Sequence, residues 1–333
     1  MEKIKGKFVT PEEAVLAVRD GDWVDYGFGA GFPELLDRAL AARRGTVKDV
    51  KVRGGLVIRP RIEIVESDPE QESFTYYSWH IGDYERKLQS RGLVRFLPVA
   101  LRYLPYLYRD GLGVGGVPYT VAKMLAASDK RDLGCHTGTI SDAFLELYRA
   151  GKLTGARKEL DTGLASWNLA MGSQELYDWL DEEPNLFHPG DLDYIHSVER
   201  IGRLSNVISI NGGVQLDLMG QENAESAGTR QLSGIGGQMD FLEGAFRSKG
   251  GKGFICINSS RVTKDGERKS NIVAAIPSGS TVSAPRTMID CVATEYGVAR
   301  LMGKSLRERA EAMASIAHPD FREELMKYAR EHF

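Results

Sequence analysis

The chain has 333 residues, of which 42% are hydrophobic and 27% are charged, and its formal net charge is -3. A single hydrophobic core stops growing at about 250–300 residues, so this length predicts two domains. The small negative charge argues against a nucleic-acid or anionic-membrane surface as the main partner, and no apolar run reaches the roughly 18 residues of a membrane span.

The N-terminal segment and the cysteines both favour the cytoplasm. The first residues, MEKIKGKFVTPEEAV, lack the apolar centre of a signal peptide. Cys135, Cys256 and Cys291 lie far apart without the spacing of metal ligands, so we expect reduced thiols. The six histidines show no paired spacing either, and no metal site is expected.

In the first part of the chain, predicted helices and strands alternate. Thr10 and Glu13 form a capping box with Pro11 at the first helical position, which predicts a helix start. The pattern then predicts a strand at 22–26, a glycine turn at 27–33, a helix at 34–43 and strands at 50–52 and 56–58.

Helical periodicity returns further along the chain, at 144–150, 173–180 and 305–317. Ser305 with Glu308, and Asp320 with Glu323, have the spacing of two further capping boxes. Strands that alternate with helices favour parallel sheets covered on both faces, so we expect an α/β fold.

Two glycine turns suggest an internal duplication. Residues 27–33 (GFGAGFP) and 113–118 (GVGGVP) each read as a strand end, a glycine turn and a proline near a helix start. Two such turns imply two similar α/β halves with a ligand between their strand ends. Neither turn spells the G-x-G-x-x-G of dinucleotide-binding folds, so a nicotinamide or flavin enzyme has little support.

The run from Asn206 to Phe241 is the most informative stretch. Residues 207–218 predict one β-strand, interrupted by Gly212-Gly213, and paired glycines inside a strand indicate a bulge or a close approach. The loop 234–237 (GIGG) follows, and its backbone N–H groups could face an oxyanion or a phosphate. The alternative is that these glycines serve only tight turns.

Several motifs together resemble the family I coenzyme A transferases, in the branch of the acetyl-CoA hydrolases and transferases. The motifs are INGGVQLDLMGQENAESAGTRQLSGIGGQMDF, FLEGAFRSKGGKGFI, ATEYGVARLMGKSLRERA and IAHPDFREEL, with WVDYGFGAGFPELLDRALAAR, KVRGGL and FTYYSWHIGDYERKL nearer the N-terminus. The resemblance covers nearly the whole chain. It implies two open, largely parallel α/β domains, residues 1–110 and 111–333, with the site in the cleft between them.

The resemblance also implies an activity. Such enzymes move CoA from a short-chain acyl-CoA, such as butyryl-CoA, to a carboxylate acceptor, such as acetate, through an enzyme glutamyl-CoA thioester. Coenzyme A is then a substrate, no tightly bound cofactor or metal is expected, and the protein is expected to be a homo-oligomer.

By the same resemblance, the family nucleophile falls on Gln215, and the oxyanion donors fall on Gly236 and Gly237. The expected contacts to substrate and CoA are Gly115, Gly116, Gly213, Gln238, Asp240 and Phe241.

The chain departs from the family pattern in four places. Gln215 stands in place of a glutamate, and a neutral amide cannot form the acyl anhydride. Gly138 stands where a glutamate is common, and Asn271 stands where an arginine is usual. Around residues 108–113 the chain lacks the end of the family's first domain, a linker and the opening strand of the second.

Gln215 leaves three interpretations open: a substitution in an otherwise normal enzyme, a natural acyl-CoA hydrolase, decarboxylase or lyase, and a binding protein without turnover. Glu222 and Glu225, after the predicted strand, are possible substitute carboxylates. Their alternative role is that of solvated loop charges.

Overall fold

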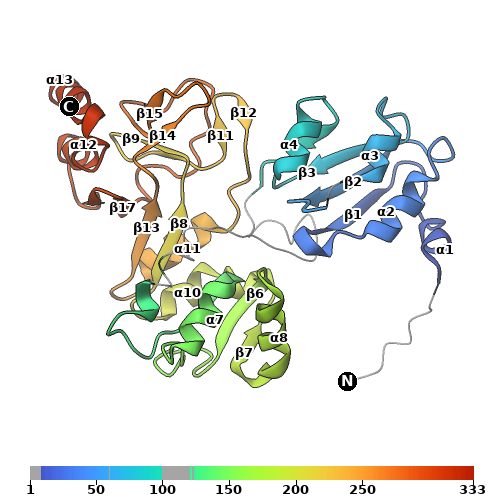
Figure 1. The fold of residues 1–333 in the computed structure, drawn as a ribbon, viewed down its shortest axis with the longest axis horizontal. Coiled ribbons are helices and arrows are strands. Elements are labelled where there is room, and N and C mark those ends of the chain that lie inside the picture. Colours follow the sequence, from blue (N-terminus) through green and yellow to red (C-terminus); the bar gives the residue numbers. More distant parts are fainter. Residues whose placement is uncertain (1–8, 60, 100–120, 122–123) are drawn as a thin grey trace. The chain divides into compact units, whose positions relative to one another are not determined.

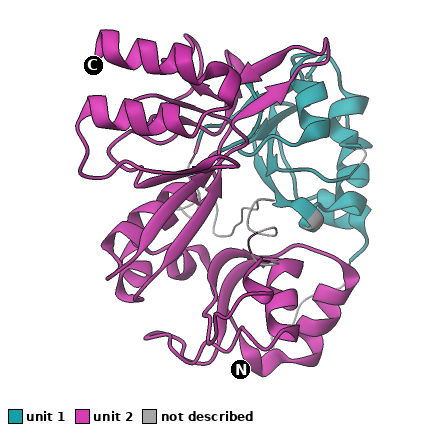
Figure 2. Ribbon diagram, turned by 60° about the vertical axis from the view of Figure 1, so that its left-hand side comes forward, with its two compact units in different colours: residues 1–98, 231–234 teal, residues 99–230, 235–333 magenta. Residues whose placement is uncertain are grey.

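The computed structural model describes residues 9–59, 61–99, 121 and 124–333 (Figure 1). They divide into two compact units, which we treat separately (Figure 2). Unit 1 holds residues 1–98 with 231–234, and unit 2 holds 99–230 with 235–333. Both units mix helices with largely parallel sheets, which confirms the predicted α/β class.

Unit 1 is built on one parallel sheet of order β1-β2-β3-β4. Its strands are β1 (Trp23–Phe28), β2 (Val50–Gly55), β3 (Phe74–Ser78) and β4 (Val94–Phe96). Its helices are α1 (Pro11–Val15), α2 (Glu34–Ala41), α3 (Glu63–Ser67) and α4 (Asp83–Gln89), with a 3-10 turn η1 (Gly29–Gly31). Val50 and Val52 are fully buried on β2 because alternate residues of a strand face the same side.

The predicted start of α1 is confirmed, since the Thr10 hydroxyl accepts the Glu13 N–H at 3.2 Å. The predicted strand at 56–58 is wrong. Leu56 has φ 48°, which lies in the left-handed region and ends the extended backbone directly after β2. The N–H of the next residue, Val57, donates instead to the buried Glu85 carboxylate at 3.0 Å.

Unit 2 begins with a parallel sheet of order β5-β6-β7. The strands are β5 (His136–Ile140), β6 (Ala165–Ala170) and β7 (Phe187–Pro189). The accompanying helices are α7 (Asp142–Arg149), α8 (Gln174–Glu182), α9 (Leu192–Ile195) and α10 (Val198–Arg203), with a 3-10 turn η3 (Pro184–Leu186). Helices α7 and α8 correspond to the helices predicted at 144–150 and 173–180.

The second large sheet of unit 2 has the order β8-β13-β17-β18, in which β17 and β18 are antiparallel. Its strands are β8 (Ile208–Gly212), β13 (Lys252–Cys256), β17 (Cys291–Thr294) and β18 (Gly297–Arg300). Helices α11 (Gln238–Arg247), α12 (Leu306–Ser315) and α13 (Pro319–His332) contribute to the same hydrophobic core as the sheet. Fully or almost fully buried Leu242, Ile255, Val292 and Met313 tie helices to strands there.

Smaller strands complete unit 2. A three-stranded sheet has the order β10-β9-β16, with β9 (Gln215–Asp217), β10 (Glu222–Asn223) and β16 (Ile272–Val273). The remaining short strands are β11 (Ser226–Ala227), β12 (Arg230–Gln231), β14 (Ser260–Val262) and β15 (Arg268–Ser270).

The single strand predicted at 207–218 is wrong, because β8 and β9 belong to different sheets. The chain changes sheet at Gly213, where a Cβ atom would come within 2.7 Å of the Glu222 Oε1 atom. The paired glycines therefore do mark a close approach, but the approaching group is a carboxylate of the same chain.

Two capping predictions near the C-terminus have different outcomes. The box formed by Ser305 and Glu308 at the start of α12 is confirmed. The box formed by Asp320 and Glu323 is wrong, because α13 begins at Pro319, two residues before the start that an N-cap at Asp320 would give. His318 is the N-cap, and its Nδ1 atom accepts the Asp320 N–H at 3.3 Å.

Some predictions fall outside the described residues. The second glycine turn, at 113–118, is one of them, and so are the domain boundary at 110/111 and the shortened stretch around 108–113. The duplication and these boundaries remain predictions.

Candidate functional site

The centre of the site is a tight turn that follows β10. Asn223 pairs with Gln215 across the β9–β10 ladder. Its side-chain Oδ1 accepts the N–H groups of Glu225 at 3.1 Å and Ser226 at 2.9 Å, and its Nδ2 donates to the Ser226 carbonyl at 2.7 Å. An asparagine that bonds its own backbone ahead fixes such a turn. The turn therefore holds the backbone of Glu225 in place.

Glu225 is 7% exposed, and its carboxylate has two donors. The Ser283 hydroxyl donates to Oε2 at 2.7 Å, and the Ile235 backbone N–H donates to the same carboxylate. Burial raises the pKa of Glu225, while the bonds from Ser283 and Ile235 act to lower it. Because Ile235 belongs to the glycine loop, the loop and this carboxylate form one site.

Glu222 lies three residues earlier in quite different surroundings. It is fully buried, and Gln238 donates its side-chain N–H to Oε2. Its Oε1 has no hydrogen-bond partner among the residues that the structure describes. Burial, with a further contribution from the charge of Glu225, raises the pKa of Glu222 to about 8. Glu222 therefore holds a proton at neutral pH.

The glycine loop is more than a tight turn. Gly236 has φ 63°, in the region that favours glycine. Gly237 is the N-cap of α11, and a Cβ atom there would lie 2.1 Å from the His196 Cε1 atom. The segment 235–237 thus contacts the Glu225 carboxylate through the Ile235 N–H and the His196 ring at Gly237.

Gln215 begins β9 and is 9% exposed. It lies opposite Asn223 in the ladder, so it shares the small sheet that carries Glu222. Its amide can donate and accept hydrogen bonds but is not a nucleophile.

The first turn of α11 carries three of the residues that were predicted to contact the substrate. Gln238 bonds Glu222, as described above. Asp240 is fully buried, and its Oδ2 lies 3.3 Å from the Nδ1 of His196. The Phe241 ring packs edge-on against His196 with 5.2 Å between ring centroids. Gly213 also joins the group, whereas Gly115 and Gly116 lie outside the described residues.

His196 is a residue that the sequence did not reveal. It follows α9 and lies 44 positions before Asp240 in the chain, so no local spacing connects the two. The contact also explains Gly138, because a Cβ atom there would be 2.9 Å from the His196 Nε2 atom. The imidazole leaves no room for the glutamate that the family pattern has at this position.

The side chain of Asn271 lies beside a cation, the Arg261 guanidinium. Its Oδ1 accepts a hydrogen bond from the Arg261 guanidinium, and its Nδ2 donates to the Asn258 carbonyl at 2.9 Å. The arginine expected at residue 271 is therefore absent, but a guanidinium contacts the side chain that replaces it.

Within the described ranges, no group of three or more His, Cys, Asp or Glu side chains is placed to hold a metal ion. None of the described helices combines the length and apolar character needed to cross a membrane.

Curated relatives resemble the chain over almost its whole length. It is 32% identical to the butyryl-CoA:acetate CoA-transferase of Anaerostipes caccae, covering 98% of this chain and 97% of the relative. The aligned span is 433 residues and the chain has 333, so about 100 aligned positions of the relative have no counterpart here. The shortening that the motifs place around residues 108–113 remains a prediction, because the aligned span does not locate these positions.

Solved structures agree with this relationship. RipA from Yersinia pestis superposes with a TM-score of 0.85 at 26% identity, covering 97% of both chains. The 4-hydroxybutyrate CoA-transferase of Porphyromonas gingivalis has a TM-score of 0.73 at 26% identity, covering 98% of this chain and 97% of its own.

Family-level matches cover both halves of the chain. Residues 2–133 match the acetyl-CoA hydrolase/transferase N-terminal domain, and residues 172–329 match the C-terminal domain of the same family. The resemblance inferred from the sequence motifs is confirmed: the chain belongs to the acetyl-CoA hydrolase/transferase family.

Proposed function

We propose that the protein transfers CoA from a short-chain acyl-CoA to a carboxylate acceptor, with Glu225 as the nucleophile. The observation that supports this proposal best is the pair of donors on Glu225, the Ser283 hydroxyl and the Ile235 N–H. They orient one carboxylate against the glycine loop that leads into α11.

The chemistry follows from this arrangement. A Glu225 oxygen attacks the thioester carbonyl, the C–S bond breaks, and a mixed anhydride forms as the CoA thiolate leaves. The thiolate then attacks the Glu225 carbonyl carbon, which releases the acyl group as a carboxylate and leaves glutamyl-CoA. An acceptor carboxylate reverses these steps. Backbone N–H groups of residues 235–237 are suited to stabilise the tetrahedral oxyanions.

Glu225 fits this role better than its two neighbours. Glu222 is fully buried and protonated at neutral pH, so its oxygens lack both charge and access. Gln215 is an amide. Burial raises the pKa of both carboxyl groups, to about 8 for Glu222, while the Ser283 and Ile235 donors act to lower that of Glu225.

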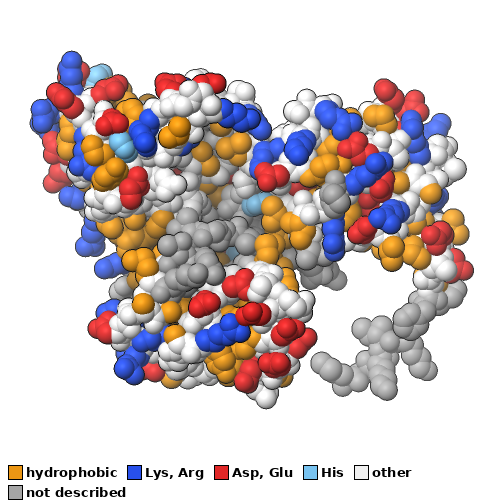
Figure 3. All heavy atoms as spheres, in the orientation of Figure 1, with side chains coloured by type: hydrophobic (Ala, Val, Ile, Leu, Met, Phe, Trp, Pro, Cys, Tyr) orange, Lys and Arg blue, Asp and Glu red, His pale blue; other side chains and the backbone are white. Residues whose placement is uncertain are grey.

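The substrates proposed are those of the relatives: butyryl-CoA as donor and acetate as acceptor, by analogy with the Anaerostipes caccae enzyme. Coenzyme A serves as a substrate and no tightly bound cofactor is required. We further propose a cytoplasmic homo-oligomer that does not bind nucleic acid. On the face shown in Figure 3, acidic and basic side chains are interspersed on each unit, without the single basic patch that nucleic acid requires.

Incubation with butyryl-CoA followed by intact-mass measurement tests the proposal. A glutamyl-CoA thioester adds the mass of CoA less one water, and fragmentation of the modified peptide separates Glu225 from Glu222 and Gln215. We expect the adduct on Glu225, its loss in Glu225→Gln, and its retention in the matched variant Glu222→Gln.

Two results would contradict the proposal. Tight binding of butyryl-CoA without any adduct, together with no exchange of CoA to acetate, would identify a binding protein. An adduct that survives in Glu225→Gln would move the nucleophile elsewhere. If transfer appeared only in Gln215→Glu, residue 215 would be the nucleophile position that the family pattern suggested.

A further inference from the structure

His196 and Asp240 form a buried pair that the transfer mechanism does not use. Asp240 is fully buried and His196 is 3% exposed. The Asp240 Oδ2 lies 3.3 Å from His196 Nδ1. A carboxylate accepts hydrogen bonds, so Nδ1 donates and the Nε2 lone pair faces the other way. An acidic partner that orients an imidazole in this manner is the arrangement of a general base.

The other ring nitrogen, His196 Nε2, is buried and has no hydrogen-bond partner within the described part of the chain. Gly138 and Gly237, which have no side chains, and the Phe241 ring lie around the imidazole. A buried polar atom without a partner is costly, so its retention suggests a ligand that donates to it.

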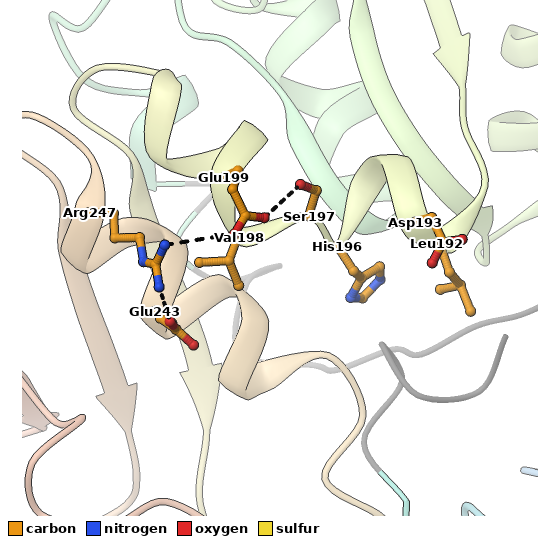
Figure 4. Close-up of a pocket in the computed structure, with 8 residues that line it drawn as sticks. All are labelled: Leu192, Asp193, His196, Ser197, Val198, Glu199, Glu243 and Arg247. Atoms are coloured by element: carbon orange, nitrogen blue, oxygen red, sulfur yellow. Dashed lines mark hydrogen bonds and ion pairs between the residues drawn. The ribbon is translucent and has the colours of Figure 1, made fainter. Parts of the chain in front are cut away.

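A cavity lies beside His196 in unit 2. His196 lines a cavity of about 310 Å³ together with residues of α9, α10 and α11. In Figure 4 its ring projects from the α9–α10 corner, away from the ion pairs that Arg247 forms with Glu199 and Glu243. The ring is therefore not committed to the charged network across the cavity.

The pair lies next to the proposed nucleophile. His196 contacts Gly237, and Ile235, two residues earlier, donates its N–H to Glu225. Two residues span at most about 7 Å of backbone. The same three-residue segment thus contacts the imidazole at one end and the reacting carboxylate at the other.

We propose that, for the acyl-CoA hydrolysis that the family name already includes, His196 oriented by Asp240 is the general base that activates water against the glutamyl-CoA thioester. This inference rests on the proposed function, since the thioester is formed on Glu225. It adds an acceptor, water, and assigns the group that handles its proton.

The step balances as follows. The water oxygen bonds to the thioester carbonyl carbon of residue 225 while one water proton passes to His196 Nε2. The tetrahedral intermediate then collapses, the C–S bond breaks, and the CoA thiolate takes the proton from Nε2. The Glu225 carboxyl group loses its remaining proton to solvent, and the site is restored. No oxidant, reductant or metal is needed.

His196→Asn tests the assignment, because the asparagine amide can still donate to Asp240 from near the Nδ1 position while the Nε2 atom is removed. The full-length protein is mixed with butyryl-CoA without any carboxylate acceptor. CoA thiol release is followed with a thiol-reactive dye, the adduct by intact mass, and CoA transfer to acetate in parallel. The matched control is His188→Asn, because the His188 ring packs at a tilt against Tyr194 and does not line the cavity.

A general base is worth about 10²–10⁴-fold, so thiol release in His196→Asn should fall at least about 100-fold. The adduct should persist correspondingly longer, transfer to acetate should change less than about threefold, and His188→Asn should behave like the parent.

Unchanged thiol release in His196→Asn, or no release from the parent protein, overturns the inference. A parallel loss of hydrolysis and transfer also overturns it, since His196 would then only support the loop. Absence of both the adduct and CoA transfer from the parent overturns the proposed function and, with it, the thioester that the inference requires, whereas an adduct in the parent with unchanged thiol release in His196→Asn overturns the inference alone.

Discussion

Glu222 and Glu225 lie at the two ends of a four-residue segment that forms one turn, yet the surroundings of their carboxyl groups differ. Glu222, in β10, is fully buried, bonded by Gln238, and its pKa is raised to about 8. Glu225, after the turn, has a hydroxyl and a backbone N–H as donors. The same side chain is therefore an uncharged core acid at one position and an oriented carboxylate at the other.

The difference shows that the surroundings of a carboxyl group, and not its place in a motif, decide its chemistry. Burial stabilises the neutral form of Glu222. Burial also raises the pKa of Glu225, but there the Ser283 hydroxyl and the Ile235 N–H act in the opposite direction and favour the anion.

The largest expected effect is a loss of activity when the proposed nucleophile, Glu225, is replaced. Glu225→Gln keeps the shape and the hydrogen-bonding reach of the side chain but removes the nucleophile. We expect kcat for CoA transfer from butyryl-CoA to acetate to fall on the order of 10⁴-fold. Steady-state transfer assays on folded protein measure the change. Glu222→Gln is the control, and a comparable loss in that variant would mean that the two carboxylates act as one unit.

The sequence predicted much of the fold but little of this distinction. Alternating strands and helices, and the caps at Thr10 and Ser305, depend on local spacing and are confirmed. The break at Gly213 was missed because β8 and β9 look continuous in the sequence. Only the packing of Glu222 against Gly213 shows why the chain must change sheet there.

The candidate site was predicted in part for the same reason. Gln238, Asp240, Phe241 and the glycine loop follow one another in the chain, so a motif can capture them. Asp240 meets His196 from 44 positions away, and Glu225 meets Ser283 from 58 positions away. Such pairs are set by tertiary packing, which no local pattern encodes. The role of Gln215 remains a prediction.

The next effect concerns the pH dependence of stability that the buried Glu222 causes. The folded-state pKa of Glu222 is about 8 and its ordinary value is 4.5, so between these values the folded protein binds more protons than the unfolded chain. The contribution of Glu222 to stability is complete below about pH 4.5 and is lost as the pH rises toward 8. A glutamine at this position does not titrate, so Glu222→Gln should not lose this stability as the pH rises.

Urea unfolding at several pH values measures the effect. Relative to the parent, Glu222→Gln should gain about 2–4 kcal/mol of unfolding free energy between pH 4.5 and pH 8. A difference between the two proteins that stays constant across this range would show that Glu222 does not titrate with a raised pKa.

A smaller loss of stability is expected when Gly213, whose backbone lies beside Glu222, is replaced. Gly213→Ala places a Cβ atom 2.7 Å from Glu222 Oε1 and 3.1 Å from the Ile255 and Ile257 methyl groups. Overpacking of this kind costs about 1–3 kcal/mol of unfolding free energy. Gly31→Ala, where a Cβ atom meets nothing within 4 Å, is the control. Equal stability of the two variants in urea would contradict the close packing around Glu222.

The smallest effect concerns a single donor to Glu225. Ser283→Ala removes the hydroxyl that donates to the carboxylate at 2.7 Å and accepts the Ala224 N–H at 3.0 Å. Because the bond from Ser283 lowers the pKa of Glu225, its loss should move the acid limb of the pH profile of kcat/KM to higher pH. The rate at neutral pH should fall about tenfold, which corresponds to about 1.4 kcal/mol of lost transition-state stabilisation.

Ser280→Ala is the control. Within the described structure, the Ser280 hydroxyl accepts a hydrogen bond from the Gly228 N–H and has no other partner, so its removal should leave the acid limb in place. An acid limb that moves equally in both variants would show that Ser283 supports the loop without orienting Glu225.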